Sequence, residues 1–463
     1  MGQADRPTWV RYQVLAVACS LAVLTYVQRQ GFVAGTPEIR RHLALDDEQM
    51  GYLLSGWLVA YGIFQVPGGL LGDRLGARHL LTLLVLGWSI VLASVAVIAL
   101  APAGVSIVLG SVAGIALTPS GVWWAFALLF ALRFLFGAFQ AGGFPGLARV
   151  VADWIPSRQR GFAQGLIWTS SRLGGFAAPL AVAWLFGVLE DWAIPFVMLG
   201  SLGLFWSAGF SAWFRNRPRD MPQVNAAELA LIESSQPAAP APHSPLQWSA
   251  LLASRNVWGL CLMYGFLGFS GNFFTNWLPD YLEHHRNITG QTRAWITALP
   301  LAFGIVSCLL GGVSSDWLIR RTGRRNLGRR LVGTTSMALA ALAMLASIWV
   351  EEPWLLAVVF STAFFFNDAT MGPAWASCAD VGERSAGALS GAMNMTGSFF
   401  AAIAMSLAGA LFHRGLDDAV FVIFAVSYLL SGIAWLVIDV TQPLHASLGP
   451  AREPDGVNRA PGG

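Results

Sequence analysis

Apolar stretches of about twenty residues or more recur along most of the chain, and short polar segments separate them. A helix needs about 20 such residues to cross the hydrocarbon core of a bilayer. Of all residues 55% are hydrophobic and 11% are charged, whereas soluble proteins contain about 25% charged residues. A chain with this balance cannot hide its apolar surface from water, so the sequence predicts an integral membrane protein.

The stretches predict an all-α membrane protein with twelve transmembrane helices. One further apolar stretch, 101–121, is interrupted by glycine and proline and fits an outer loop or a half-span. We interpret it as a loop, because a thirteenth crossing would invert every later loop. The twelve expected spans lie near residues 13–36, 48–70, 79–101, 122–147, 161–187, 193–214, 256–280, 293–317, 330–350, 354–376, 384–411 and 418–440.

Arginine is distributed unevenly between the two sets of loops. All 28 basic residues are arginine, a bias that we attribute to a GC-rich bacterial genome. Because loops rich in basic residues stay on the cytoplasmic side, we expect a multi-pass protein of the bacterial inner (plasma) membrane with both termini in the cytoplasm. The inner loops carry Arg74, Arg78, Arg158, Arg160, Arg215, Arg217, Arg219 and the cluster from Arg320 to Arg330, and the outer loops carry Arg40, Arg41, Arg286, Arg293 and Arg414.

The longest polar interval divides the spans six and six. We therefore expect an N-terminal half at 1–214, a cytoplasmic linker at 215–255 and a C-terminal half at 256–440. Within the linker, Ala226 to Ser234 fits a short surface helix. The remaining residues, 441–463, are rich in proline, glycine and arginine, which predicts a disordered cytoplasmic tail.

Three arginines, Arg29, Arg133 and Arg172, lie deep inside apolar stretches of the first half. A guanidinium near the bilayer centre costs at least about 2.5 kcal/mol, so it persists where it faces a polar cavity or a negative partner. Only one acidic residue, Asp368, falls well inside an expected span, which leaves room for a substrate that brings its own negative charge. Arg133 shares a helical face with Gln140, and a guanidinium holds a carboxylate through two parallel hydrogen bonds.

Some of these side chains have a second interpretation. Arg29 fits a helix end from which the side chain snorkels to the interface. Arg172 fits a pair with Asp368 or a helix C-terminus as well as a substrate contact. Four further polar side chains within the spans suit either substrate hydroxyls or hydrogen bonds between helices, namely Tyr61, Tyr264, Asn272 and Asn394.

An internal repeat connects the two halves. A Gly-x-x-x-Asp turn follows the second expected span and recurs after the eighth, at an offset of 312 − 69 = 243 residues. Glycine lets two helices approach closely, and the aspartate can lie against the positive N-terminal end of a neighbouring helix. Because such contacts can break and reform, we predict a gating role for Gly69, Asp73, Arg74, Gly76, Arg78, Gly312 and Asp316.

This repeat resembles the major facilitator superfamily, and the resemblance covers essentially the whole chain. The inner-loop signature of that family, Gly-x-Leu-x-Asp-Arg-x-Gly-x-Arg, is matched from Gly69 to Arg78, and the second copy keeps Gly312 and Asp316. The resemblance implies two pseudo-symmetric halves of six helices that rock about a site near the bilayer midplane.

Finer features resemble the anion:cation symporter branch, which includes bacterial carriers of sugar acids and aromatic acids. The resemblance implies that Arg29 and Arg133 face a central cavity and hold an organic anion, and that Tyr61 occupies a cavity position. The matching segments are Tyr61-Gly-Ile-Phe-Gln65-Val-Pro67-Gly68-Gly69, Arg133-Phe with Gly137 and Phe144-Pro145, Ser171-Arg172-Leu-Gly174, Trp277-Leu-Pro279-x-Tyr281, Trp375-Ala-x-x-Ala-Asp380 and Gly391-Ala-Met-Asn394.

The chain departs from this branch where protons are carried. Bacterial members usually have one acid just before the first-span arginine and another in the fourth span, but here these positions hold Gln28 and Gln140. Glutamine does not titrate, so that proton path is absent. Asp368 is the remaining carboxylate within a span, and we expect it to couple transport to protons, with a structural ion pair as the alternative.

We therefore expect a secondary transporter that moves a small organic anion by alternating access, with proton symport as the first expectation. The sequence leaves the substrate open among a sugar acid, a dicarboxylate and an aromatic carboxylate. Sodium coupling, uniport and exchange are alternatives, and a membrane sensor that binds ligand without transporting it is an alternative of another class.

An enzyme is not expected. All seven histidines fall in loops or tails, so the spans offer no histidine cluster for a metal or a catalytic base. The four cysteines have unrelated spacings and suit packing. We expect a monomer in the lipid bilayer without a cofactor, metal or nucleic-acid partner.

Overall fold

The computed structural model describes residues 6–43, 47–100, 120–189, 191, 193–234, 253–442 and 444. Within these ranges the chain is helical apart from short connections. The expected loop at 101–121 and the expected tail at 441–463 lie almost wholly outside the described residues. The all-α membrane fold expected from the sequence is confirmed.

Within its described residues, the first half contains seven α-helices that account for the first six expected spans and part of the linker. Helix α2 runs through the second and third expected spans and is kinked at Gly76, whose φ of 76° lies in the left-handed region that favours glycine. The fourth span is divided into two helices at Gly142. The helices are α1 (Val10–Leu43), α2 (Asp47–Leu100), α4 (Ser120–Ala141), α5 (Gly143–Trp154), α6 (Arg160–Val188), α7 (Ala193–Trp213) and α8 (Ala226–Glu233).

The second half repeats this arrangement. Its fourth span is again divided into two helices, here at Thr370, so the interruption occurs at equivalent places in both halves. The helices are α10 (Arg255–Asn276), α11 (Leu278–His284), α12 (Gly290–Thr322), α13 (Arg325–Ala346), α14 (Pro353–Ala369), α15 (Met371–Gly382), α16 (Ala386–Phe412) and α17 (Asp417–Val437).

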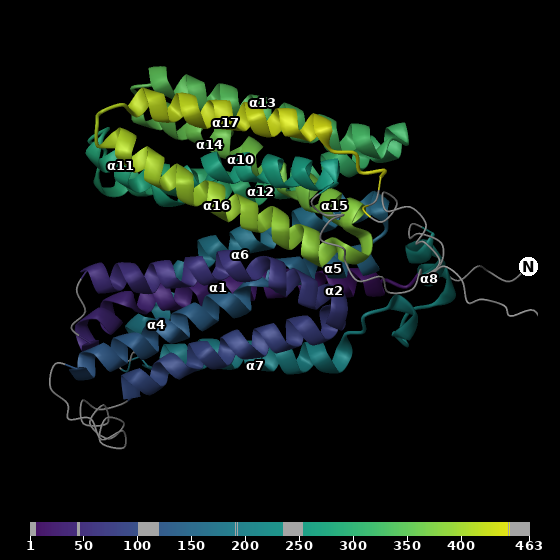
Figure 1. The fold of residues 1–463 in the computed structure, drawn as a ribbon, viewed down its shortest axis with the longest axis horizontal. Coiled ribbons are helices and arrows are strands. Elements are labelled where there is room, and N and C mark those ends of the chain that lie inside the picture. Colours follow the sequence, from purple (N-terminus) through teal and green to yellow (C-terminus); the bar gives the residue numbers. More distant parts are fainter. Residues whose placement is uncertain are drawn as a thin grey trace, which may run out of the picture.

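The two halves form two helical bundles that lie side by side (Figure 1). Ten stretches of the described chain are long and apolar enough to cross a membrane. One of them, Gly56–Ala96, contains two expected spans, and helix α6 supplies the remaining one of the twelve. The halves meet mainly where α2 packs against α16 and where α6 packs against α12.

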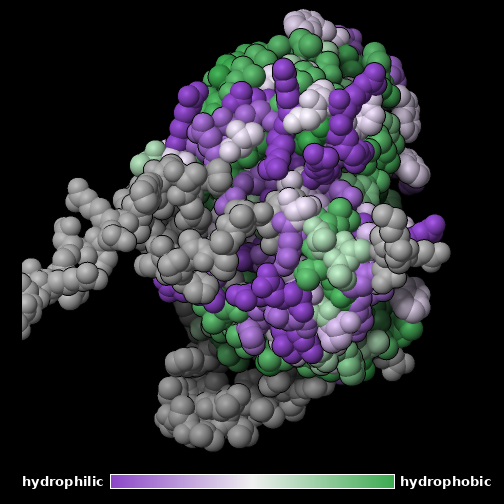
Figure 2. All heavy atoms as spheres, turned by 90° about the vertical axis from the view of Figure 1, so that its right-hand side faces the viewer, coloured by the Kyte–Doolittle hydropathy of each residue, from purple (hydrophilic) through white to green (hydrophobic). Residues whose placement is uncertain are grey.

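One end of the molecule carries α8 and both Gly-x-x-x-Asp turns, and we refer to it as the motif end. Figure 2 shows this end, where hydrophilic side chains gather in an upper and a lower area, and hydrophobic ones lie along the rim and in a smaller patch near the centre. Arg74 and Arg158 are exposed here from the first half, as are Arg320 and Arg321 from the second. An end with many charges beside apolar flanks is what the boundary of a membrane span requires.

At the motif end, each repeat aspartate caps a helix of the opposite half. Asp73 accepts hydrogen bonds from the backbone N–H groups of Gly387 at 3.1 Å and Ala388 at 2.8 Å, at the start of α16. Asp316 accepts from Gly161 at 3.1 Å and Phe162 at 2.6 Å, at the start of α6. Free N–H groups and a positive dipole favour a carboxylate at a helix N-terminus, so the repeat makes the contact expected of it.

The two repeat glycines allow this contact. A Cβ atom on Gly69 would lie 2.1 Å from the carbonyl oxygen of Gly387, and one on Gly312 would lie 2.2 Å from that of Gly161. One ion pair and one hydrogen bond across the halves lie beside these contacts. Arg160 donates to Asp380 at 2.7 Å, and Arg329, from the second half, donates to the backbone oxygen of Ser157 at 3.4 Å.

A single methyl group at Gly69 is expected to weaken the closure of the motif end. Gly69→Ala forces the start of α16 away from α2, and a misplaced methylene in a packed interface costs about 1–3 kcal/mol. We expect a thermal unfolding midpoint several degrees below that of the parent protein in detergent. Gly62→Ala is the matched control, because a Cβ on Gly62, in the same helix, meets nothing within 4 Å. Equal midpoints for the two variants would contradict the prediction.

The linker helix α8 is fastened to the start of α1. Glu228 is fully buried and accepts hydrogen bonds from the backbone N–H groups of Val10 at 3.3 Å and Arg11 at 3.1 Å, and the Arg11 guanidinium pairs with it at 3.0 Å. Asn225 caps α8 by accepting from the N–H of Glu228. The expected helix at Ala226 to Ser234 is confirmed, but its Glu228 is buried against the start of α1, whereas Glu233 lies at the surface.

Candidate functional site

The candidate site is built around the ring of Trp57 on α2. The guanidinium carbon of Arg29, from α1, lies 4.6 Å from the centre of this ring, and that of Arg133, from α4, lies 5.8 Å from it. Arg29 also lies over Tyr61, at 5.2 Å, and Arg133 lies over Phe32, at 3.9 Å. Aromatic faces attract cations, so the aromatic side chains hold both arginines in the first half. We refer to Arg29, Arg133, Trp57 and Tyr61 as the arginine cluster.

The arginine cluster contains hydrogen-bond donors that lack acceptors. Arg133 is only 3% exposed, yet its Nε and Nη1 groups have no partner, and neither has Nη2 of Arg29 or Nε1 of Trp57. Among the residues that the structure describes, no carboxylate pairs with Arg29 or Arg133. A buried charge without a partner is costly. Such a group of donors suits a ligand that supplies negatively charged acceptor oxygens.

Two glutamines flank the cluster in fixed positions. Gln140 accepts from Nε of Arg29 at 3.3 Å and donates to the backbone oxygen of Thr25 at 3.3 Å. Gln28 is fully buried on the far side of α1, where it donates to the backbone oxygen of Leu199 at 2.8 Å and accepts from Nε1 of Trp88 at 2.5 Å. Gln140 is therefore part of the site, whereas Gln28 joins α1 to α2 and α7.

One contact links the cluster to the second half. Asn394 on α16 donates to the hydroxyl of Tyr61 at 3.4 Å, and one turn away Gln65 donates to Ser398 at 3.1 Å. The Tyr61 ring stacks on Trp57 with a centroid distance of 5.3 Å. Tyr61 and Asn394 thus lie where the sequence analysis expected a shared site.

Arg172 lies apart from the cluster and pairs with Asp368. Its Nε and Nη2 atoms donate to the two carboxylate oxygens of Asp368 at 2.6 and 2.9 Å, in a bidentate contact between α6 and α14. Asn367 donates to the same carboxylate at 3.0 Å, and Asp368 is fully buried. The sequence left Arg172 open to a substrate contact or to a structural pair, and the structure contains the ion pair with Asp368. This pair joins the two halves within their spans.

Aromatic side chains fill the space between this ion pair and the motif end. Phe144 on α5 stacks on Trp168 on α6 with centroids 4.8 Å apart, and Trp168 lies 5.4 Å from Trp375 on α15. Tyr264 on α10 accepts from Nε1 of Trp375 at 3.3 Å and donates to the sulfur of Met371. Tyr264 is thus a buried member of this aromatic layer.

Other predicted residues make local contacts. Asn272 donates to the backbone oxygen of Gly268 in its own helix at 2.8 Å, so the structure does not bring it to the arginine cluster. Arg78 donates to the backbone oxygen of Ser211 at 2.6 Å and thereby binds the last turn of α7 within the first half. Arg74 is exposed. Among the described residues, Asn272 and Arg78 make their hydrogen bonds within their own halves.

Sequence reasoning missed the aromatic part of the site. Trp57 lies four residues before Tyr61, and Tyr26 lies three residues before Arg29, so each is on the same helical face as a predicted residue. That spacing was a usable signal. The spacing could not predict that α1, α2 and α4 pack together. This packing places Trp57 against arginines from two other helices.

The described residues contain no group of three or more His, Cys, Asp or Glu side chains that could hold a metal ion. The four cysteines are free. The side chains of the arginine cluster offer positive charge, hydrogen-bond donors and aromatic faces to a ligand.

Comparison with known proteins gives consistent matches over most of the chain. The family model described as the Major Facilitator Superfamily matches residues 18–405. The probable sulfoacetate transporter of Cupriavidus necator is 29% identical over 93% of this chain and 94% of its own length. The probable galactarate/D-glucarate transporter of Bacillus subtilis is 29% identical, with 84% and 83% covered, and the D-galactonate transporter of Escherichia coli is 26% identical, with 79% and 80% covered.

Solved structures agree in fold. A crystal structure of the transporter FucP in the outward conformation aligns with a TM-score of 0.64 at 14% identity and covers 91% of this chain and 97% of that one. The proton:xylose symporter XylE aligns with a TM-score of 0.65 at 12% identity and covers 91% and 94%.

Proposed function

This chain belongs to the major facilitator superfamily, and we propose that it is a secondary transporter that carries a small organic anion by alternating access, coupled to protons. It is a multi-pass membrane transporter and not an enzyme, and its relatives are transporters of sugar acids and sulfoacetate. The substrate class, alternating access and proton coupling are what we propose beyond that.

One observation carries the proposal, namely the unpartnered donors of the arginine cluster. Arg29 and Arg133 bring two positive charges, and the neutral Gln140 beside them compensates neither. An anion that bridges the two guanidiniums would satisfy donors that are otherwise buried without acceptors. The Trp57 and Tyr61 rings would cover its apolar part.

A dianion fits this site better than a monoanion. Among the described residues the cluster combines two arginines with no acid, which gives it a formal charge of +2. A dicarboxylate, or an acid with a carboxylate and a sulfonate, would balance both charges. The names of the relatives that carry galactarate, glucarate and sulfoacetate are in keeping with this choice.

Alternating access is supported by where the halves touch. The halves make contacts at the motif end through Asp73, Asp316 and Arg160, and the aromatic layer adds contacts beside that end. By the distribution of arginine this end is cytoplasmic, so we interpret the conformation as closed to the cytoplasm. Breaking these contacts would open the site to the inner side.

Asp368 is the proposed coupling residue. Protonation of its carboxylate would weaken the bidentate contact with Arg172 and loosen one link between the halves. In this scheme protonation of Asp368 loosens the contact between α6 and α14, while the substrate binds at the arginine cluster. If a proton gradient has no effect on uptake, sodium coupling, uniport or exchange replaces proton symport in this proposal.

Uptake into liposomes tests the proposal. Purified protein would be reconstituted and supplied with galactarate, galactonate, sulfoacetate and benzoate, with and without an inward proton gradient. We expect saturable uptake of at least one organic anion, a preference for the dianions, and accumulation that increases with the gradient. Uptake that ignores the gradient contradicts proton symport, and binding without counterflow favours a sensor over a transporter.

A further inference from the structure

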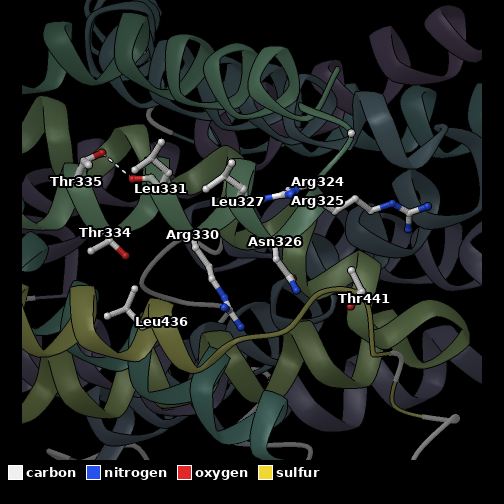
Figure 3. A pocket seen from close by; sticks show the side chains of 11 residues that line it. Arg324, Arg325, Asn326, Leu327, Arg330, Leu331, Thr334, Thr335, Leu436 and Thr441 are labelled. Carbon is white, nitrogen blue, oxygen red and sulfur yellow. Dashed lines mark hydrogen bonds between the residues drawn. The ribbon is translucent and has the colours of Figure 1, made fainter. Parts of the chain in front are cut away.

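A pocket of about 910 Å³ lies between the start of α13 and the end of α17 (Figure 3). None of the residues that line it belongs to the arginine cluster or to the contacts between the halves. It lies within the second half alone, at the level where α13 begins and α17 ends. At this level a span passes from the hydrocarbon core to the aqueous side.

Three arginines line the polar part of the pocket. Arg324 and Arg325 are exposed at the start of α13, and no acid among the described residues forms an ion pair with them. Arg330, one turn further on, donates through Nε to the backbone oxygen of Ile438 at 2.7 Å, which directs its side chain towards the end of α17 (Figure 3). The three guanidiniums therefore come from the turn before α13 and from the first turns of α13 itself.

Asp439, an acid that contacts the pocket lining, does not neutralise these three arginines. Asp439 accepts from Asn326 at 2.7 Å and from the Thr441 hydroxyl at 2.6 Å. Although partial burial opposes it, these hydrogen bonds and the nearby Arg330 lower the pKa of the Asp439 carboxyl below its ordinary value. With Asp439 ionised, three arginines and one aspartate leave the pocket with a net charge of 3 − 1 = +2.

The other part of the pocket is apolar and open to the outside of the bundle. Leu327 and Leu331 follow the arginines along α13 with 40% and 44% of their surfaces exposed, and Leu436 on α17 is 55% exposed. Exposed leucines on a membrane span lie against lipid chains. The pocket thus places a cationic region at the end of a span directly beside an apolar region within that span.

We propose that this pocket binds a phospholipid with an anionic headgroup. The phosphate lies against Arg324, Arg325 and Arg330, and the acyl chains lie along Leu327, Leu331 and Leu436. Basic pockets between transmembrane helices at the cytoplasmic boundary bind anionic headgroups in this way. A soluble phosphate would use the arginines alone and leave the leucines without a role, so the combination favours a lipid.

Lipid retention by the full-length protein tests the proposal. The protein in detergent would be titrated with dioleoylphosphatidylglycerol, and bound lipid would be counted by native mass spectrometry. We expect the double variant Arg324→Gln with Arg325→Gln to bind phosphatidylglycerol about tenfold more weakly, because each arginine near an anionic headgroup contributes several-fold to binding. The matched control is Arg320→Gln with Arg321→Gln, which removes the same charge from exposed positions outside the pocket; this control should stay within about twofold of the parent protein.

Two results would overturn the proposal. If both double variants bound phosphatidylglycerol equally weakly, the attraction of the lipid would be spread over the arginines of the whole motif end. Displacement of the lipid by inorganic phosphate or glycerol phosphate at the concentration of the lipid itself would mean that the pocket is a site for a free anion.

Discussion

Replacing Arg133 by methionine should abolish uptake of the organic anion and, at the same time, raise the thermal stability of the empty protein. Two hydrogen bonds from a charged donor are together worth about 3 kcal/mol or more, so we expect transport to fall by about 100-fold or more. The rise in stability has a separate cause. Arg133 is buried with two unpartnered donors, and an apolar side chain of similar size removes the desolvation of that charge.

This pair of opposite effects separates a binding role from a structural one. Initial uptake rates in liposomes and unfolding midpoints in detergent would be measured for Arg133→Met and for Arg158→Met, which removes the same charge from an exposed position of the same half. The control should alter neither quantity by much. If Arg133→Met transported normally, or if it lost activity because it unfolded at a lower temperature, the arginine cluster would not be the substrate site.

Replacing Asp368 by asparagine should uncouple transport from the proton gradient and destabilise the protein. Removing one partner of a buried ion pair leaves the other charge unpaired, at a cost of about 3–5 kcal/mol. In this chain that charge is Arg172, which loses both bonds of a bidentate contact. We expect accumulation driven by a pH gradient to disappear, while exchange of labelled for unlabelled substrate across the membrane continues.

A double-mutant cycle supplies the control. The variants would be Asp368→Asn, Arg172→Gln and the two together, each assayed for unfolding, exchange and proton-driven accumulation. The double variant should recover much of the lost stability, because it removes both charges, but it should remain uncoupled. Full proton-driven accumulation in Asp368→Asn would refute the coupling role and leave the pair as a structural link between the halves.

The membrane spans and the internal repeat could be read from the sequence because their causes are local. Each span follows from a run of apolar residues, and each Gly-x-x-x-Asp turn is a short pattern whose chemistry is set by its own members. The two aspartates therefore cap helices as expected, although only the structure identifies the starts of α16 and α6 as the helices they cap.

The site was predicted less completely, and Arg172 shows why. The sequence left it between a substrate contact and a partner for Asp368, since both residues are charged groups in apolar stretches 196 positions apart. Gln28 illustrates the same limit. It precedes Arg29 in the chain, but neighbouring residues on a helix point in different directions, so Gln28 faces α7 while Arg29 faces Trp57.

Composition, span length and the repeat were sufficient to determine a twelve-helix membrane protein with arginines buried in its first half. Which arginine is paired and which is free was decided by tertiary packing. Arg172 meets a carboxylate because α6 packs against the second half, whereas among the described residues Arg29 and Arg133 meet aromatic rings and a neutral amide. The physical reason is that the role of a charge inside a membrane depends on the groups within a few ångströms of it. Packing between helices that are distant in the sequence decides which groups those are.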